Sequence, residues 1–209
     1  MARANPTRSS DAPRDAIALL KQDHRAVEHL VSRFEDADES EQSEIAERIC
    51  NMLTVHAQIE EEILYPAAKE ALAEDEEEAE LVPEAEVEHA SAKDLIAKIQ
   101  GMTPDDESFK ATVKVLGEYV KHHVKEQENE RFPALRKTDL DLNEIGARLA
   151  DRKHALMEQL GIEEEAPPTP ASKRSTRSRA KPSSRTARQA RAASRSKSAR
   201  SSSGRGTRH

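Results

Sequence analysis

The stretch IAERICNMLTVHAQIEEEI, residues 45–63, decides the fold. Its apolar side chains recur every three or four residues, which is the spacing of one face of an α-helix. That face contains Ile45, Ile49, Leu53 and Ile63, together with His56 and Glu60. The two polar residues stand where the pattern requires apolar ones. The stretch therefore predicts an amphipathic helix that directs a histidine and a glutamate toward the core.

Three other long stretches show the same periodicity, and each also places one histidine on its apolar face. Their faces consist of Ile17, Leu20, His24, Val27, Val31 and Phe34; of Val82, Ala85, His89, Ala92, Ile96 and Ile99; and of Phe109, Val113, Leu116, Val120, His123 and Gln127. No segment alternates with a period of two over a useful length, so no sheet is expected. Four long amphipathic helices with short connections predict an all-α fold, an antiparallel four-helix bundle.

Capping residues and prolines predict where the helices begin and end. The first helix is expected to be capped by Asp11, with Pro13 in its first turn. Pro66 is expected to kink or interrupt the second helix, because proline has no N–H to donate. The second and third helices are expected to begin near Ser40 and Pro83, and a shorter fifth helix to span residues 142–160.

The charge is distributed unevenly along the 209 residues. Residues 166–209 contain 13 of the 33 Lys and Arg residues and no Asp or Glu, which leaves 20 basic and all 40 acidic residues in the other 165. The basic segment is rich in Ser, Arg and Ala and cannot bury enough surface to offset the entropy of ordering. The predicted organisation is a disordered lead over residues 1–12, the bundle over 13–161 and a disordered basic tail over 162–209.

The basic tail makes DNA or another polyanion a candidate partner. It contains no aromatic residues for stacking on bases, so contacts with phosphates would dominate. Two other interpretations remain open: the tail is a solubilising segment, or it folds back on an acidic body of net charge −20.

Other features bear on location. No stretch approaches the roughly 18 apolar residues that a membrane-spanning helix needs, and the N-terminus lacks an apolar signal region. A single cysteine, Cys50, excludes an intrachain disulfide. A cytoplasmic location is therefore expected.

The four inward histidines suggest a metal site. One buried histidine is usually a hydrogen-bonded core residue, because an unpartnered imidazole costs a few kcal/mol. Four of them on four packed helices can meet at one level of the bundle. Glu60 lies one helical turn after His56 and shares its face. Neutral imidazole with carboxylate is a ligand set for iron, zinc, manganese or copper.

The histidine motifs resemble those of hemerythrin-like HHE cation-binding proteins. The resemblance covers residues 14–160 and rests on Asp23-His24, HAQIEEEILYP (56–66), Glu88-His89 and HHVKEQENERFP (122–133). Two of these motifs separate histidine from proline by ten residues. The resemblance implies a non-haem di-iron centre that binds oxygen or handles nitric oxide or peroxide. By position, it implies the metal ligands His24, His56, Glu60, His89, His123 and Gln127.

Two departures from the family pattern leave alternatives open. Gln127 stands where the family carries a glutamate, and Glu126 or Glu128 could replace it through a small rotation of the helix. His122 with Glu126 competes with His123 as the inward pair. The chain also offers four strong histidines where oxygen carriers use five. Residues that could complete the site are His29, His122, Tyr65 and Tyr119. Otherwise one metal keeps an open position, which favours sensing or redox chemistry over oxygen carriage.

Several functions remain compatible with these motifs. The leading hypothesis is a metal-binding protein that binds or senses oxygen, nitric oxide or peroxide, or stores iron. The alternatives are a di-iron redox enzyme, peroxidase-like or iron-repairing, and a nucleic-acid-associated protein that acts through its tail. A ferritin-like centre is disfavoured, because Glu86-x-x-His89 is only one of the two such pairs that it needs.

Overall fold

The computed structural model describes residues 15–162, which form helices and turns with no strand in that range. In chain order, the elements are α1 (Ala16–Asp36), α2 (Glu39–Ile59), the π-helical segment η1 (Glu60–Leu64), α3 (Tyr65–Leu72), α4 (Glu76–Ala79), α5 (Leu81–Gln100), α6 (Phe109–Glu126), the π-helical segment η2 (Gln127–Arg131), α7 (Phe132–Leu135) and α8 (Leu142–Leu160).

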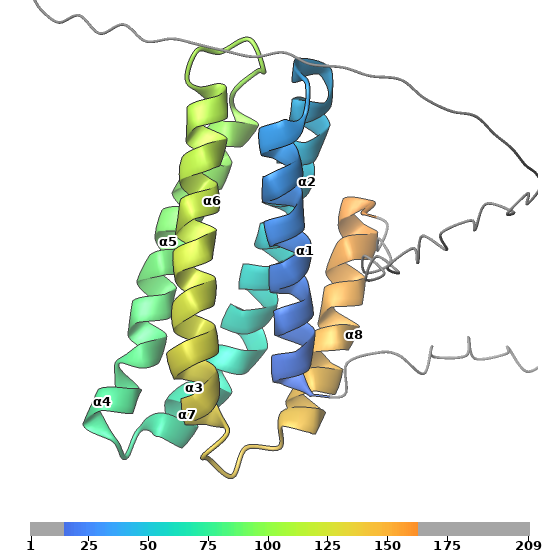
Figure 1. Ribbon diagram of the computed structural model, residues 1–209. Helices are drawn as coiled ribbons and strands as arrows, with labels where there is room; N and C mark the ends of the chain where they lie inside the picture. Colours follow the sequence, from blue (N-terminus) through green and yellow to red (C-terminus); the bar gives the residue numbers. More distant parts are fainter. Residues whose placement is uncertain (1–14, 163–209) are drawn as a thin grey trace, which may run out of the picture. The chain divides into compact units, whose positions relative to one another are not determined.

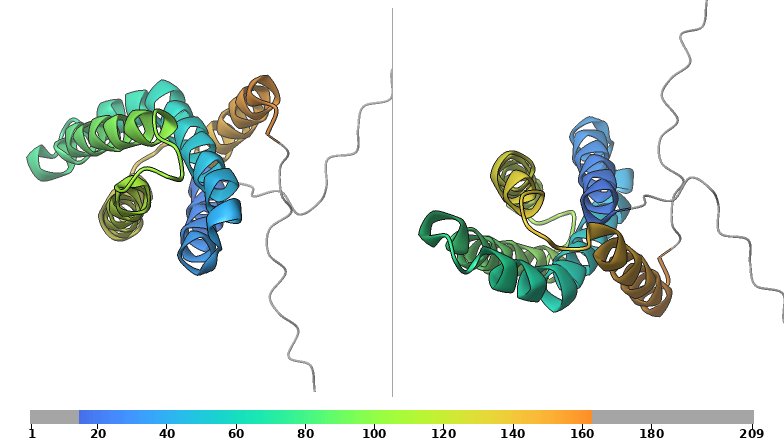
Figure 2. Two further views of the ribbon diagram at one scale, coloured as in Figure 1. Left: turned by 90° about the horizontal axis from the view of Figure 1, so that it is seen from above. Right: turned by 90° about the horizontal axis from the view of Figure 1, so that it is seen from below.

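The four long helices run alternately up and down along one axis (Figure 1). The helices α1 and α5 each pack against both α2 and α6, and α8 lies outside the α1–α2 pair (Figure 2). The expected all-helical bundle and the fifth helix over 142–160 are therefore confirmed. Among the helices of residues 15–162, none combines the length and the apolar character that a membrane span requires. The expected lead and almost all of the expected tail fall outside the described residues.

Two helix starts differ from the sequence-based prediction. The first helix begins at Ala16, where Asp15 accepts a hydrogen bond of 2.7 Å from the Ala18 N–H. Asp15 is itself a good capping residue directly before the apolar stripe, so the prediction of a start at Asp11 was wrong; Asp11 and Pro13 lie outside the described residues. The third long helix, α5, begins at Leu81, so that Pro83 falls within its first turn.

Pro66 does not end its helix. Instead, η1 widens the helix just before it, and the Tyr65 N–H donates to the carbonyl of Glu60, five residues back. The wider turn accommodates the proline ring, which in a regular α-helix would collide with the carbonyl four residues earlier. The second segment, η2, stands in the same relation to Pro133, and there the Phe132 N–H donates to the Gln127 carbonyl. Both wide turns begin at a residue that is four positions after a histidine.

The core consists of two hydrophobic clusters with a polar layer between them. One cluster contains the α8 side chains Leu149 and Leu156 with Ile17 and Leu20, and the other lies toward the α1–α2 and α5–α6 connections. Seven of the nine buried polar residues in the described chain belong to the layer between: Asp23, His24, His56, Glu60, His89, Gln127 and Arg131. Burial of polar groups at one level, and not throughout, marks that level as a site.

The helix α8 approaches α1 very closely at Gly146. A Cβ atom at this position would lie 2.6 Å from the Ala16 nitrogen and 2.7 Å from the Asp15 carbonyl carbon. Both are backbone atoms and cannot turn aside, so glycine is required for α8 to dock at this distance.

Candidate metal centre

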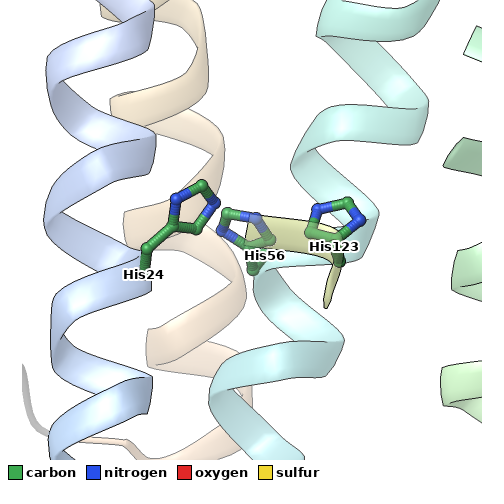
Figure 3. A group of neighbouring side chains, drawn as sticks. All are labelled: His24, His56 and His123. Carbon is green, nitrogen blue, oxygen red and sulfur yellow. The ribbon is translucent and has the colours of Figure 1, made fainter. Parts of the chain in front are cut away.

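Four histidines, one from each long helix, lie at one level of the bundle and form the histidine layer: His24, His56, His89 and His123 (Figure 3 shows three of them). The ring centres of His24 and His56 are 5.1 Å apart, and those of His89 and His123 are 5.0 Å apart. The His123 ring lies 6.2 Å from both His24 and His56. The separate apolar stripes of the four helices thus converge, as expected from the sequence.

Glu60 lies fully buried beside the layer, with 0% exposure. Its Oε2 atom is 3.4 Å from His56 Nε2, 3.3 Å from His89 Nε2 and 3.8 Å from His123 Nε2. One carboxylate oxygen therefore faces three imidazoles from three helices, which is the placement of a group that could bridge two cations.

Gln127 and Tyr65 complete the floor around Glu60. The Gln127 amide nitrogen donates to Glu60 Oε1, while its own Oε1 atom is buried without a hydrogen-bond partner among the described residues. The Tyr65 hydroxyl donates to Glu60 Oε2 over 3.2 Å and lies 3.1 Å from His89 Nε2. Gln127 is therefore at the inward position predicted for it, and Tyr65 is the extra candidate that reaches the site.

The outward nitrogen, Nδ1, of every histidine in the layer faces a carboxylate from a different helix, and we call these four acids the carboxylate ring. The contacts are Asp23 Oδ2 to His56 at 3.6 Å, Glu61 Oε1 to His89 at 3.0 Å, Glu88 Oε2 to His123 at 2.9 Å, and Glu128 Oε1 to His24 at 3.1 Å. Each acid lies on a long helix or on the wide turn that follows it, and it faces the histidine of the next long helix. The acid that follows α6 faces the histidine of α1, so the ring closes. A carboxylate on Nδ1 fixes the ring orientation and leaves Nε2 to bind a metal.

Each acid of the carboxylate ring also contacts a cation. The pairs are Lys153 Nζ with Asp23 Oδ1 at 2.6 Å, Lys93 Nζ with Glu61 Oε1 at 2.7 Å, Arg131 Nη2 with Glu88 Oε2 at 2.8 Å, and Lys21 Nζ with Glu128 Oε2 at 2.8 Å. These cations balance the charge of the acids, so the histidine layer is surrounded by ion pairs and not by bare carboxylates.

The electrostatics of the layer favour the neutral form of His24 and His123 and the charged form of Glu60. Burial lowers the pKa of His24 to about 4, and burial also lowers the pKa of His123. Burial opposes the charge of His56 as well, but the nearby Glu60 and Asp23 carboxylates raise its pKa. Burial would raise the pKa of Glu60, and His56 and His89 overcome this and hold it well below its usual range. Neutral imidazole and ionised carboxylate are the forms that bind a metal ion.

Two sets of donor atoms at the histidine layer could each hold a metal ion. One set is His24, His56 and His123; the other is Glu60, His89 and His123; within each, the donor atoms lie within 4.8 Å of one another. The Nε2 atoms of His24, His56 and His123 are buried and have no hydrogen-bond partner between residues 15 and 162. Buried nitrogens without partners are costly, and a metal ion would satisfy all three. The donor set therefore fits the iron that the sequence suggested.

The structure also places the alternatives that the sequence left open. His122 points outward with 61% side-chain exposure and forms a separate group of possible donors with the partly buried Glu88 and Glu126, so His123 is the inward member of the pair. Glu128 faces His24 Nδ1 from outside the layer. His29 is exposed and Tyr119 is 44% exposed, which removes both from the histidine layer.

The roles of the carboxylate ring and of its cations were missed from the sequence. Asp23 and Glu88 had been noticed as the residues before His24 and His89, but each supports the histidine of another helix. The signal that could have found these acids is that each one is the direct sequence neighbour of a residue that points into the core.

Comparison with known proteins gives these contacts a context. The sequence model of the family described as "Hemerythrin HHE cation binding domain" matches residues 15–135. This range is more than half of the chain and includes the whole histidine layer. The chain belongs to the hemerythrin HHE family. The helix α8, which supplies Lys153, follows the matched region of this HHE protein.

Two similar proteins, one a solved structure and one a curated sequence, show how far the similarity extends. The crystal structure of a hemerythrin HHE cation binding domain-containing protein from Mycobacterium kansasii shares the fold with a TM-score of 0.60 at 21% identity, over 69% of this chain and 88% of that one. A protein named DNA nickase from Nostoc sp. is 29% identical over 119 residues, which are 56% of this chain and 32% of the nickase. The chain thus spans about a third of the length of this curated relative.

Proposed function

We propose that this HHE protein holds two iron ions in the histidine layer and uses them to bind or sense oxygen, nitric oxide or peroxide. The single observation that carries the proposal is the set of buried Nε2 atoms on His24, His56 and His123, which have no hydrogen-bond partner among residues 15–162. They adjoin a fully buried carboxylate, Glu60. Iron bound there would supply redox chemistry and affinity for small ligands.

The residues of the chain have distinct parts in this proposal. His24, His56, His89 and His123 would bind through Nε2, Glu60 would bridge, and Gln127 would hold Glu60 through its amide. The carboxylate ring would orient the imidazoles, as outer-shell acids commonly do. With four histidines and one buried carboxylate, fewer donors surround the two ions than in a site with five histidines and two carboxylates. Open positions suit ligand sensing or redox turnover, including the peroxidase-like and iron-repair activities, more than storage.

Metal analysis with an optical spectrum tests the proposal directly. Aerobically purified protein should contain up to two irons per chain and absorb in the near ultraviolet through charge transfer to iron. Azide or nitric oxide should shift these bands. Zinc in place of iron, with no visible or near-ultraviolet bands after ferrous reconstitution, would refute the di-iron proposal.

A second candidate function, association with nucleic acid, is favoured by the relative named DNA nickase. The basic residues that would carry it lie at 166–209, outside the described residues. Binding through phosphates should weaken steeply with salt, by about −0.9 in log K per log salt for each phosphate neutralised, and should be indifferent to sequence. Removing residues 163–209 should abolish DNA binding and leave the iron content unchanged. Equal DNA binding by the shortened chain would contradict this role for the tail.

A further inference from the structure

A cavity of about 360 Å³ adjoins the histidine layer on the side away from Glu60. All four histidines of the layer line one end of it. From there it extends toward the α1–α2 and α5–α6 connections, and Glu60, Gln127 and Tyr65 are not among its lining residues. The layer therefore has two different sides, a packed polar floor and an open space.

Most of the wall surface of this space is apolar. Beyond the four histidines, the apolar side chains that line it include Val27, Leu53, Ala92, Ile96, Val120 and Val124, and the polar ones are Asp23, Glu88, Ser91, Lys93 and His122. A water molecule occupies about 30 Å³ in the liquid, and a dry cavity of about 150 Å³ can hold benzene. The volume thus exceeds what a diatomic gas or peroxide needs, even after metal ions take up part of it, and lies in the range of pockets for small organic ligands.

The exposed edge of the cavity contains large apolar side chains beside the exposed Lys93 and His122. Val87 on α5 is 68% exposed and Tyr119 on α6 is 44% exposed, and both line the cavity. Val115, one turn before Tyr119, is 45% exposed. These are three of the four large hydrophobic side chains that are exposed in the described part of the chain. Exposed apolar side chains of α5 and α6 therefore adjoin the cavity that reaches the histidine layer.

We propose that this cavity binds an uncharged organic molecule that has an apolar body and one oxygen-containing head group, such as an alcohol, phenol or organic hydroperoxide. The apolar part of the walls accepts the body. The charged lining residues Asp23, Glu88 and Lys93 are already in ion pairs, so a charged body would lose its hydration there without gaining a free partner. The head group lies against the histidine rings that line the cavity, or against metal held by them. The inference deepens the proposed function by naming a substrate class, and it rests on that function only for what happens at the metal.

The probe for the test is 2-phenyl-2-propanol, a stable alcohol that cannot itself oxidise the centre. Full-length protein, stripped of metal and separately loaded with ferrous iron without oxygen, is titrated with the probe by calorimetry and by chemical shifts of the valine methyl groups. Saturable binding is expected in both forms, with shifts at Val27 and Val120. Ala92→Phe fills the cavity and should weaken binding by about tenfold or more. Ala90→Phe, on the exposed face of the same helix, should change it less than about twofold.

A second variant, at the surface, keeps the test valid if the Ala92→Phe protein does not fold. Val87→Glu adds a charge at the exposed edge of the cavity without touching the core, so the probe should bind more slowly and more weakly. The absence of saturable binding to the wild type, or equal binding by the wild type, Ala92→Phe and Val87→Glu, would overturn the inference. Iron content and the azide-induced change in the spectrum are measured on the same samples. If these are normal and the probe does not bind, the cavity proposal alone fails; if iron is absent and the probe binds, the di-iron proposal alone fails.

Discussion

Lys153 of α8 contacts Asp23 of α1 at 2.6 Å, and through this carboxylate the fifth helix reaches the histidine layer. The other oxygen of Asp23 lies 3.6 Å from His56 Nδ1. Both partners are largely buried, with side-chain exposures of 15% and 6%. A helix outside the four-helix core therefore balances the charge of an acid that supports a candidate ligand.

Replacement of Lys153 by methionine should destabilise the metal-free protein by about 3 kcal/mol, because it leaves a buried carboxylate without its cation. A metal ion in the histidine layer should reduce this loss of stability, because its positive charge, transmitted through His56, stabilises the Asp23 carboxylate. Denaturant unfolding with and without metal measures both effects. Arg152→Met is the matched control, because Arg152 pairs with the exposed Glu62 on the surface and should cost at most about 1 kcal/mol. Equal losses in the two variants would contradict a special role for Lys153.

Loss of a histidine from the layer should remove metal and leave the helices intact. His56→Ala and His89→Ala should each lower bound iron severely, while the helical signal in circular dichroism changes little because both hydrophobic clusters remain. His154→Ala, an exposed histidine on α8, serves as the control and should keep the wild-type iron content. Normal iron in both layer variants would exclude the proposed ligand set.

The carboxylate ring can be tested at Asp23. Asp23→Asn keeps the shape of the side chain but removes the charge that faces His56 Nδ1, and loss of such outer-shell acids typically weakens metal binding by about 10–100-fold. Competition with a coloured chelator measures this affinity. Asp36→Asn makes the same change at an exposed position of α1 and should have no effect. An unchanged affinity in Asp23→Asn would show that the ring does not support metal binding.

Gln127→Glu should have opposite effects on the metal-free and metal-bound states. Without metal, the amide that donates to Glu60 becomes a second buried carboxylate beside it, so the free energy of unfolding should fall by about 1–3 kcal/mol. With iron, the added charge offsets the repulsion between two cations, and the second ion should bind more tightly than in the wild type. Ferrous titration of the apo-protein checks this. Gln58→Glu, which faces Glu62 on the surface, is the control. Equal affinity for the second ion in the wild type and in Gln127→Glu would contradict this expectation.

Gly146→Ala should loosen α8. Its new methyl group would meet two backbone atoms at the start of α1, the Ala16 nitrogen and the Asp15 carbonyl carbon, and overpacking of this kind costs about 1–3 kcal/mol. The unfolding midpoint should fall, and amide exchange should rise in α8. Gly101→Ala meets nothing closer than 3.5 Å and should be nearly neutral. Unchanged exchange in α8 would argue against the close docking.

The histidine layer could be predicted from sequence because each of its members interrupts a local stripe. His56 and Glu60 lie on one helix, so their shared face follows from helical geometry alone. The carboxylate ring could not be predicted in this way. Glu128 is 104 residues from His24, and their contact depends on how far each helix is rotated about its own axis. The cavity could not be predicted from the sequence either, because it depends on the space between Ala92 and side chains of three other helices.

The two wide turns before Pro66 and Pro133 have a consequence for relatives of different length. His56 and Tyr65 are nine residues apart, and in an unbroken α-helix they would point about 180° away from each other. Both nevertheless contact Glu60 Oε2, at 3.4 Å and 3.2 Å. The wide turn η1 thus accommodates one extra residue, while the helical residues that follow keep the same faces toward the core. A chain that lacked Glu62 would keep the same faces in its core but would no longer have a wide turn to present Glu60 to the histidine layer and Glu61 to His89 Nδ1. Relatives that differ by one residue at this place should therefore share the fold and differ in the metal site.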